Sequence, residues 1–137
     1  MKNKEADSNV KINKISEDFF EFLCSECLEV CYVVKLGIPE YLNEKCVIFE
    51  GLTHAKAVDI KYAKKIFKFI EKNEIMKLHY FLIRKKLLEY GIDAFCPDCN
   101  KVYCKKDYHV RVVIDEEGFY DYTEACCPKM SERIIDD

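Results

Sequence analysis

The sequence predicts an α+β fold, in which a helical N-terminal body of three or more helices packs beside a metal-stapled β-hairpin. Two observations predict the helical body. Apolar residues recur with a helical period after Ser16, and they do so again between Ile60 and Leu88. A third observation predicts the hairpin. Beyond Ala94 the apolar residues alternate, and cysteines flank the alternating run.

The size and composition of the chain favour one compact unit. With 137 residues, 50% of them hydrophobic, the chain can bury one sizeable core. We expect a mobile segment at 1–15, a helical body at 16–93 and a hairpin module at 94–137, the last two forming one unit. The first residues are polar and lack the apolar region of a signal peptide, and no apolar run is long enough for a membrane span. We therefore expect a soluble, cytoplasmic protein without a membrane partner.

The first predicted helix begins after Ser16, whose hydroxyl is suited to cap the free amides of a first turn. Its apolar stripe includes Cys24, Cys27 and a third cysteine, Cys31, and a free cysteine on such a stripe acts as a small hydrophobe. We therefore interpret Cys24 and Cys27 as packed residues, although their spacing is also that of half a zinc site. The alternative is two metal sites, or one site built from both ends of the chain, with Cys46 as a further ligand.

Two more helices are predicted, one ending near Lys72 and one between Ile75 and Gly91, after a short strand or buried loop at 46–49. The first of them carries a lysine stripe, and the second ends in a basic cluster. Such a surface can bind phosphates, although lysines more commonly fill a solvated helix face. The residues of this candidate nucleic-acid surface are Lys61, Lys65, Lys68, Lys72, Arg84 and Lys85.

The last third of the chain carries the strongest chemical motif. Cys96-Pro97-Asp98-Cys99 can fold as a tight turn that directs both thiolates to one point, which is half of a tetrahedral zinc site. Two further ligands are needed, and we expect Cys104 and Cys127, with Cys126 and His109 as alternates. This stretch resembles zinc ribbons and treble clefs, and the resemblance implies a structural Zn²⁺ and a docking or nucleic-acid role. It covers only the last quarter of the chain and departs from the common pattern at its second cysteine pair.

A β-hairpin is predicted between these cysteines, with strands at 110–114 and 119–123 and a turn at 115–118. Its returning strand is aromatic and acidic. Tyrosine is favoured at protein interfaces, so we expect this strand either to contact a protein partner or to fill the core. The candidate partner-binding residues are Phe119, Tyr120, Asp121 and Tyr122.

The chain lacks the usual catalytic motifs, such as a His-x-Glu with Pro-Cys-x-x-Cys pair, a His-Glu-x-x-His motif or a phosphate-binding glycine loop. The favoured function is therefore a small intracellular zinc-binding protein that acts as a non-enzymatic protein-interaction module of adaptor, inhibitor or immunity type. An alternative is a nucleic-acid-binding protein that uses the lysine stripe. A second alternative is a thiol or metal-dependent enzyme, which requires an open metal position or a thiol of depressed pKa.

Overall fold

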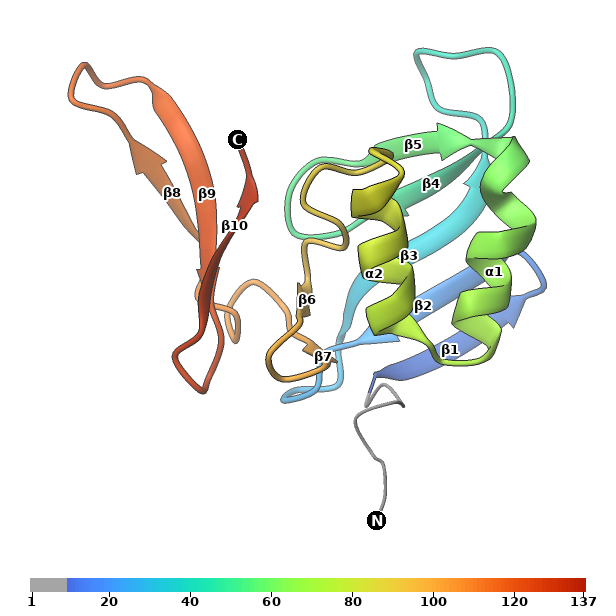
Figure 1. The fold of residues 1–137 in the computed structure, drawn as a ribbon, viewed down its shortest axis with the longest axis horizontal. Coiled ribbons are helices and arrows are strands. Elements are labelled where there is room, and N and C mark those ends of the chain that lie inside the picture. Colours follow the sequence, from blue (N-terminus) through green and yellow to red (C-terminus); the bar gives the residue numbers. More distant parts are fainter. Residues whose placement is uncertain (1–9) are drawn as a thin grey trace.

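The largest element of the protein is an antiparallel five-stranded sheet whose strands follow one another in chain order (Figure 1). The computed structural model describes residues 10–137. The strands are β1 (Lys11–Ser16), β2 (Phe19–Leu23), β3 (Val30–Gly37), β4 (Cys46–Glu50) and β5 (Lys56–Asp59). Part of the expected mobile segment, residues 1–9, lies outside the described residues, whereas β1 occupies most of its remainder as an edge strand of the sheet.

The predicted helical body of three or more helices is wrong. The stretch from Ser16 to Gly37, expected as the first helix, forms strands β2 and β3 and the turn between them. The part of the chain that the structure describes is mostly β, with only two α-helices. The α+β class must therefore be replaced by a predominantly β fold in which two helices cover a sheet.

The physical reason lies in the burial pattern of β2 and β3. Phe20 and Phe22 are 1% and 0% exposed, and they alternate with half-buried neighbours as residues of a strand do. Aromatic and β-branched residues dominate both strands, and these residue types fit a pleated, half-buried surface. The helical period arose because apolar residues of the turn at 24–28 were counted as one face with those of the strands.

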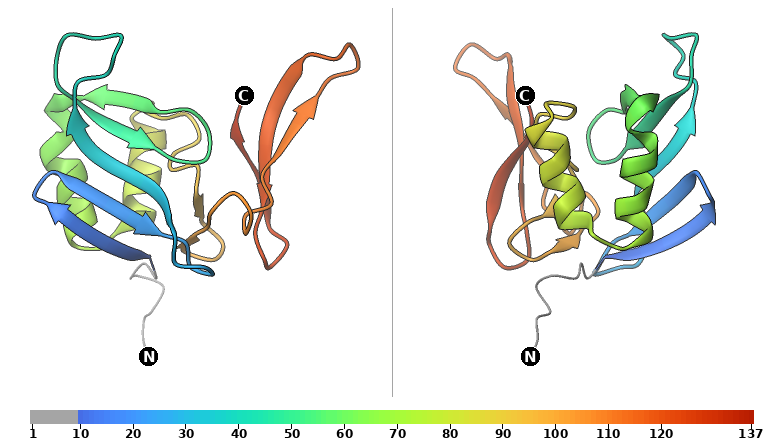
Figure 2. Two further views of the ribbon diagram at one scale, coloured as in Figure 1. Left: turned by 180° about the vertical axis from the view of Figure 1, so that it is seen from behind. Right: turned by 45° about the vertical axis from the view of Figure 1, so that its right-hand side comes forward.

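Two helices cover one face of the sheet, as the rear and turned views show (Figure 2). A 3-10 turn, η2 (Ile60–Tyr62), leads into α1 (Ala63–Glu71), and α2 (Ile75–Arg84) follows after a short joint. Ile66 and Ile70 of α1 are buried. The ring of Phe67, also on α1, stacks on the ring of Phe20 of β2, with 5.7 Å between the ring centres. Among the described residues, no helix is both long and apolar enough to cross a membrane.

The rest of the chain forms two small sheets beside this body. Strands β6 (Phe95–Cys96) and β7 (Lys101–Val102) make a two-stranded ladder. Strands β8 (Arg111–Ile114), β9 (Tyr120–Cys126) and β10 (Glu132–Asp136) make a three-stranded sheet in the order β10-β9-β8. The β8–β9 hairpin projects away from the five-stranded sheet (Figures 1 and 2).

Arg133 of β10 connects the two parts. Its guanidinium donates hydrogen bonds to the backbone carbonyls of Tyr90, Ile92 and Phe95 at 3.2, 2.7 and 3.1 Å. These carbonyls belong to the loop that follows α2 and to Phe95, the first residue of β6, directly before Cys96. A planar guanidinium with several fixed donors is suited to this task, so Arg133 fixes the loop that enters the first cysteine motif of the C-terminal segment.

Candidate metal centres

Four turns of the chain begin with a cysteine. They start at Cys24 between β2 and β3, at Cys96, the last residue of β6, at Cys104 after β7, and at Cys127 between β9 and β10. In the first three, the backbone N–H four residues later donates to the carbonyl of the first cysteine, at 2.9, 2.8 and 2.9 Å. This closed turn brings the side chains at its first and fourth positions together, as two metal ligands require.

The first cluster of ligand atoms, site A, consists of Cys24, Cys27, Cys104 and Asp107, all within 4.8 Å of one another. The Sγ atoms of Cys27 and Cys104 are 3.8 Å apart, and Asp107 Oδ2 is 3.1 Å from Cys24 Sγ and 3.2 Å from Cys104 Sγ. Tetrahedral zinc with its usual bond lengths separates two sulfurs by about 3.8 Å and a sulfur from an oxygen by about 3.6 Å. Site A therefore has the donors and nearly the dimensions of a four-ligand zinc site.

The second cluster, site B, consists of Cys96, Cys99 and Cys127, whose Sγ atoms also lie within 4.8 Å of one another. Cys99 Sγ and Cys127 Sγ are 3.5 Å apart. The backbone N–H of Ser131 donates to Cys127 Sγ at 3.3 Å, which stabilises a thiolate there. Site B thus supplies three of the four donors of a tetrahedral site.

The two clusters are interleaved in sequence. Turns one and three supply site A, and turns two and four supply site B. Site A consequently joins the β2–β3 turn to the segment after β7, while site B joins the β6–β7 ladder to the β9–β10 turn. Backbone bonds support this arrangement. Ser25 N–H donates to Val102 O at 2.8 Å between the two segments that site A joins, and Cys126 N–H, beside site B, donates to Tyr108 O, beside site A, at 2.7 Å.

Burial and hydrogen bonds shift the pKa values of the cluster residues in different directions. Burial raises the pKa of Cys96 and of Cys104 to about 12, so these thiols keep their protons at neutral pH when no cation is near. Hydrogen bonds from the thiols of site A lower the pKa of Asp107. Burial acts to raise the pKa of Cys127, but the backbone N–H groups of its own turn outweigh it, and the pKa is lowered. Metal binding must therefore displace protons from most of these thiols.

The structure brings together three of the four expected ligands, Cys96, Cys99 and Cys127, and puts Cys104 in site A instead. The two alternate ligands that the sequence suggested, Cys126 and His109, lie in neither cluster. Cys126 is half-buried, with Sγ 3.7 Å from the carbonyl oxygen of Cys127, and His109 is exposed.

Sequence reasoning did not assign three residues of site A. The packing interpretation of Cys24 and Cys27 depended on a helix that does not exist, and the alternative of two metal sites is the arrangement that the geometry favours. Asp107 was missed altogether, although the spacing Cys104-x-x-Asp107 repeats that of the Cys-x-x-Cys pairs and could have indicated it. Cys31 and Cys46 are buried and belong to neither cluster.

The expected partner-binding hairpin is exposed. Phe119 and Tyr120 are 67% and 46% exposed, Asp121 is exposed, and Tyr122 is half-buried. The neighbouring strand β8 adds Val112 and Ile114, and it forms one edge of its sheet. The side chain of Asp115 accepts hydrogen bonds from the backbone N–H groups of Glu117 and Phe119, both at 2.9 Å, and so bridges the turn before β9.

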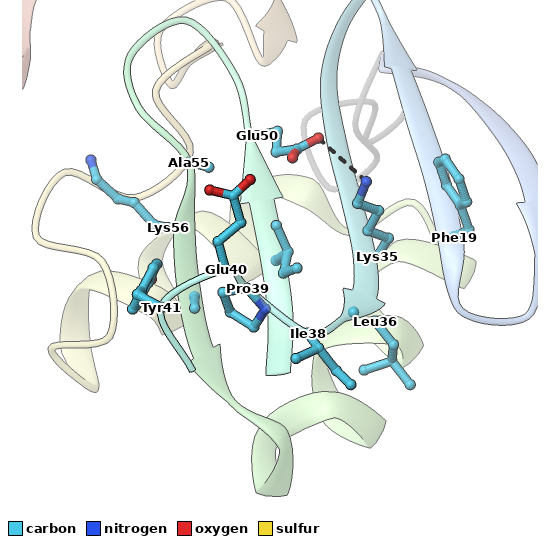
Figure 3. Close-up of a pocket in the computed structure, with 13 residues that line it drawn as sticks. Phe19, Lys35, Leu36, Ile38, Pro39, Glu40, Tyr41, Glu50, Ala55 and Lys56 are labelled. Atoms are coloured by element: carbon cyan, nitrogen blue, oxygen red, sulfur yellow. Dashed lines mark ion pairs between the residues drawn. The ribbon is translucent and has the colours of Figure 1, made fainter. Parts of the chain in front are cut away.

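A pocket of about 610 Å³ lies on the face of the five-stranded sheet that the helices leave free (Figure 3). Phe19, Lys35 and Ile48 form a row across its floor, since they are paired neighbours on β2, β3 and β4. The loop after β3 borders the pocket with Tyr41, which is 72% exposed. Lys35 forms an ion pair with Glu50 at 3.6 Å beside this row. The sequence alone did not indicate this pocket.

The residues of the candidate nucleic-acid surface are all exposed. Lys61 lies on η2, Lys65 and Lys68 lie on α1, Lys72 caps α1, and Arg84 with Lys85 ends α2. The ammonium group of Lys65 lies 5.3 Å from the ring centre of Phe81, and that of Lys61 lies 5.4 Å from the ring centre of Tyr62. A role in nucleic-acid binding stays a prediction.

Comparison with known proteins gives one match. A family model described as a domain of unknown function, DUF8328, matches residues 42–137. The match includes all of site B and the second half of site A, and it begins after Cys24 and Cys27. No curated protein and no solved structure matches the chain. Because the match spans more than half of the sequence, the chain belongs to the DUF8328 family.

Proposed function

We propose that this protein is a non-enzymatic protein-interaction module in which two structural Zn²⁺ ions hold the β8–β9 hairpin in position for a protein partner. The observation that carries the proposal is the pair of interleaved clusters, sites A and B. A set of thiolates at tetrahedral spacing is typical of zinc, and hard cations such as Mg²⁺ prefer oxygen donors.

The topology argues for a structural role of the metal. The ladder of β6 and β7 has only two residues in each strand, and so small a ladder is not stable by itself. Each site ties this ladder region to a different part of the chain, so both ions contribute directly to its folding. Loss of the ions should therefore release the segment from about residue 94 onward while the five-stranded sheet keeps its helices.

Limited proteolysis tests this role. We expect the metal-loaded protein to resist cleavage after Lys101, Lys105 and Lys106, because the backbone there is held by the folded turns. Chelator treatment in reducing buffer should make these the first sites of cleavage. Equal cleavage with and without chelator would contradict a structural role.

The exposed hairpin supports the interaction part of the proposal. Val112, Ile114 and Phe119 are 54%, 52% and 67% exposed, which gathers large apolar side chains on one projecting hairpin. Strand β8 also has an unpaired edge, to which a partner strand can add. A metal ion in site B would fix the base of this hairpin through Cys127, which directly follows β9.

A matched pair of variants tests the hairpin. Phe119→Ser removes an exposed aromatic side chain from the hairpin, and Tyr41→Ser removes one from the far pocket, with exposures of 67% and 72%. In cross-linking from cells, we expect a partner to be captured by the wild type and by Tyr41→Ser but lost with Phe119→Ser. A partner that is retained by Phe119→Ser and lost with Tyr41→Ser would assign the interaction to the pocket instead.

A further inference from the structure

Site B differs from site A in the number of ligands. Within the described residues, site A has four candidate donors and site B has three. A tetrahedral ion bound by three protein ligands keeps one position for a water or another external donor, whereas four ligands close the site. The reason for the missing donor lies in the fourth turn.

The fourth turn is one residue shorter than the other three. Its closing hydrogen bond joins Met130 N–H to Cys127 O at 2.8 Å, three residues apart, and the carbonyl of Ser131 accepts from Cys127 N–H at 3.0 Å. Met130, with a φ of 69°, occupies the left-handed position that ends this three-residue loop. In the turns at Cys24 and Cys96 the residue in this conformation follows the second cysteine, at Leu28 and Asn100.

The shortened turn has no residue that can complete the site. Pro128, Lys129 and Met130 follow Cys127, and none has a side chain that commonly binds zinc. All three are exposed, but Cys96 and Cys127 are only 1% and 0% exposed, whereas Cys99 is half-buried, so an external ligand must approach the cluster beside Cys99. Asp98, the carboxylate within the Cys96–Cys99 turn, accepts a hydrogen bond from Ser131 Oγ and is not a member of the cluster.

We propose that the metal of site B is bound by Cys96, Cys99 and Cys127 alone and takes a small-molecule thiolate from solution as its fourth ligand. This inference rests on the proposed function, because it requires that both sites bind a metal. Thiolate is the class of external donor that matches the three thiolates already present, and it displaces a bound water, taking that position as RS⁻ after losing its proton to buffer. Site A, with its carboxylate, accepts no such ligand.

Cadmium NMR of the full chain tests this, because the cadmium chemical shift reports the number of sulfur ligands at each site separately. We expect two resonances, one of which moves toward the four-thiolate range when 2-mercaptoethanol is added, and returns when the thiol is dialysed away. The moving resonance should be absent in Cys127→Ser. Two resonances that ignore the added thiol would overturn the inference while leaving the proposed function intact, whereas no cadmium resonance at all would remove the proposed function.

Two carboxylate variants keep the test decisive if Cys127→Ser fails to fold. Asp107→Ala opens the corresponding position of site A, so we expect both resonances to move with thiol in this variant. Asp98→Asn should respond as the wild type does. If Asp98 moves to the metal and fills the fourth position, the thiol-dependent shift appears only in Asp98→Asn, and that result overturns the proposal.

Discussion

The clearest consequence of site A is the effect of replacing Asp107 with alanine. A structural zinc ion contributes about 10–16 kcal/mol of binding free energy at neutral pH, so each of four ligands accounts for about 2.5–4 kcal/mol. At about 1.4 kcal/mol for each factor of ten, losing one ligand weakens binding by about 10²–10³-fold. A water that takes the vacated position recovers part of this, so we expect about a 100-fold loss for site A. Competition with a zinc chelator at neutral pH measures it.

Glu26 provides the matched control for this variant. It is an exposed carboxylate within the Cys24–Cys27 turn, and it is not a member of the cluster. Glu26→Ala therefore removes the same charge from the same neighbourhood without removing a ligand, and an exposed charge is worth at most about 1 kcal/mol, or about fivefold. Equal losses for Asp107→Ala and Glu26→Ala would refute Asp107 as a ligand, and so would full zinc affinity in Asp107→Ala.

Three further predictions concern other parts of the molecule. Burial of His79, helped by the positive charge of Arg133, lowers the pKa of its imidazole from 6.5 to about 3. Between these two pH values the folded protein keeps His79 neutral, whereas the unfolded chain binds a proton there. The stability that this group contributes is complete above about pH 6.5 and is lost as the pH falls toward 3. His79→Asn keeps an acceptor for the N–H of Ile92 and should flatten the acid side of a plot of unfolding free energy against pH. An unchanged slope would contradict this. Arg133→Met removes the three donors that fix the segment before Cys96. Urea denaturation should show a free energy of unfolding lower by about 3–5 kcal/mol. A change below about 1 kcal/mol would show that these hydrogen bonds contribute little. If the lysine stripe binds nucleic acid, Lys65→Glu with Lys68→Glu should lower the salt concentration at which the protein elutes from heparin, and elution at the wild-type salt would count against that role.

The sequence predicted the second half of the molecule better than the first. The helices α1 and α2 and the β8–β9 hairpin were expected because each has a clear local pattern, such as the buried Ile66 and Ile70 of α1. Strands β2 and β3 were missed because the closely spaced cysteines between them extended an apparent helical period. A five-stranded meander also depends on pairing between strands, and single-sequence periodicity does not report pairing.

The metal clusters were predicted only as far as local spacing could reveal them. Cys96 and Cys99 form a complete turn in the sequence and were expected as ligands, and the geometry agrees in bringing them beside Cys127. The fold decides which of the cysteine turns lie together. Cys24 and Cys104 are far apart in sequence and come together only when the β2–β3 turn lies beside the segment after β7. A carboxylate in the place of a fourth cysteine was outside the pattern that the cysteines suggested.

The central claim, that two interleaved sites each hold a metal ion, is tested most directly by the metal content of the native protein. Elemental analysis of protein purified in reducing buffer without added metal should give two zinc ions per chain. The double variant Cys24→Ser with Cys104→Ser should keep one ion, bound at site B. A wild-type protein that contains no metal, or one that contains a single ion lost completely in this double variant, would contradict the account.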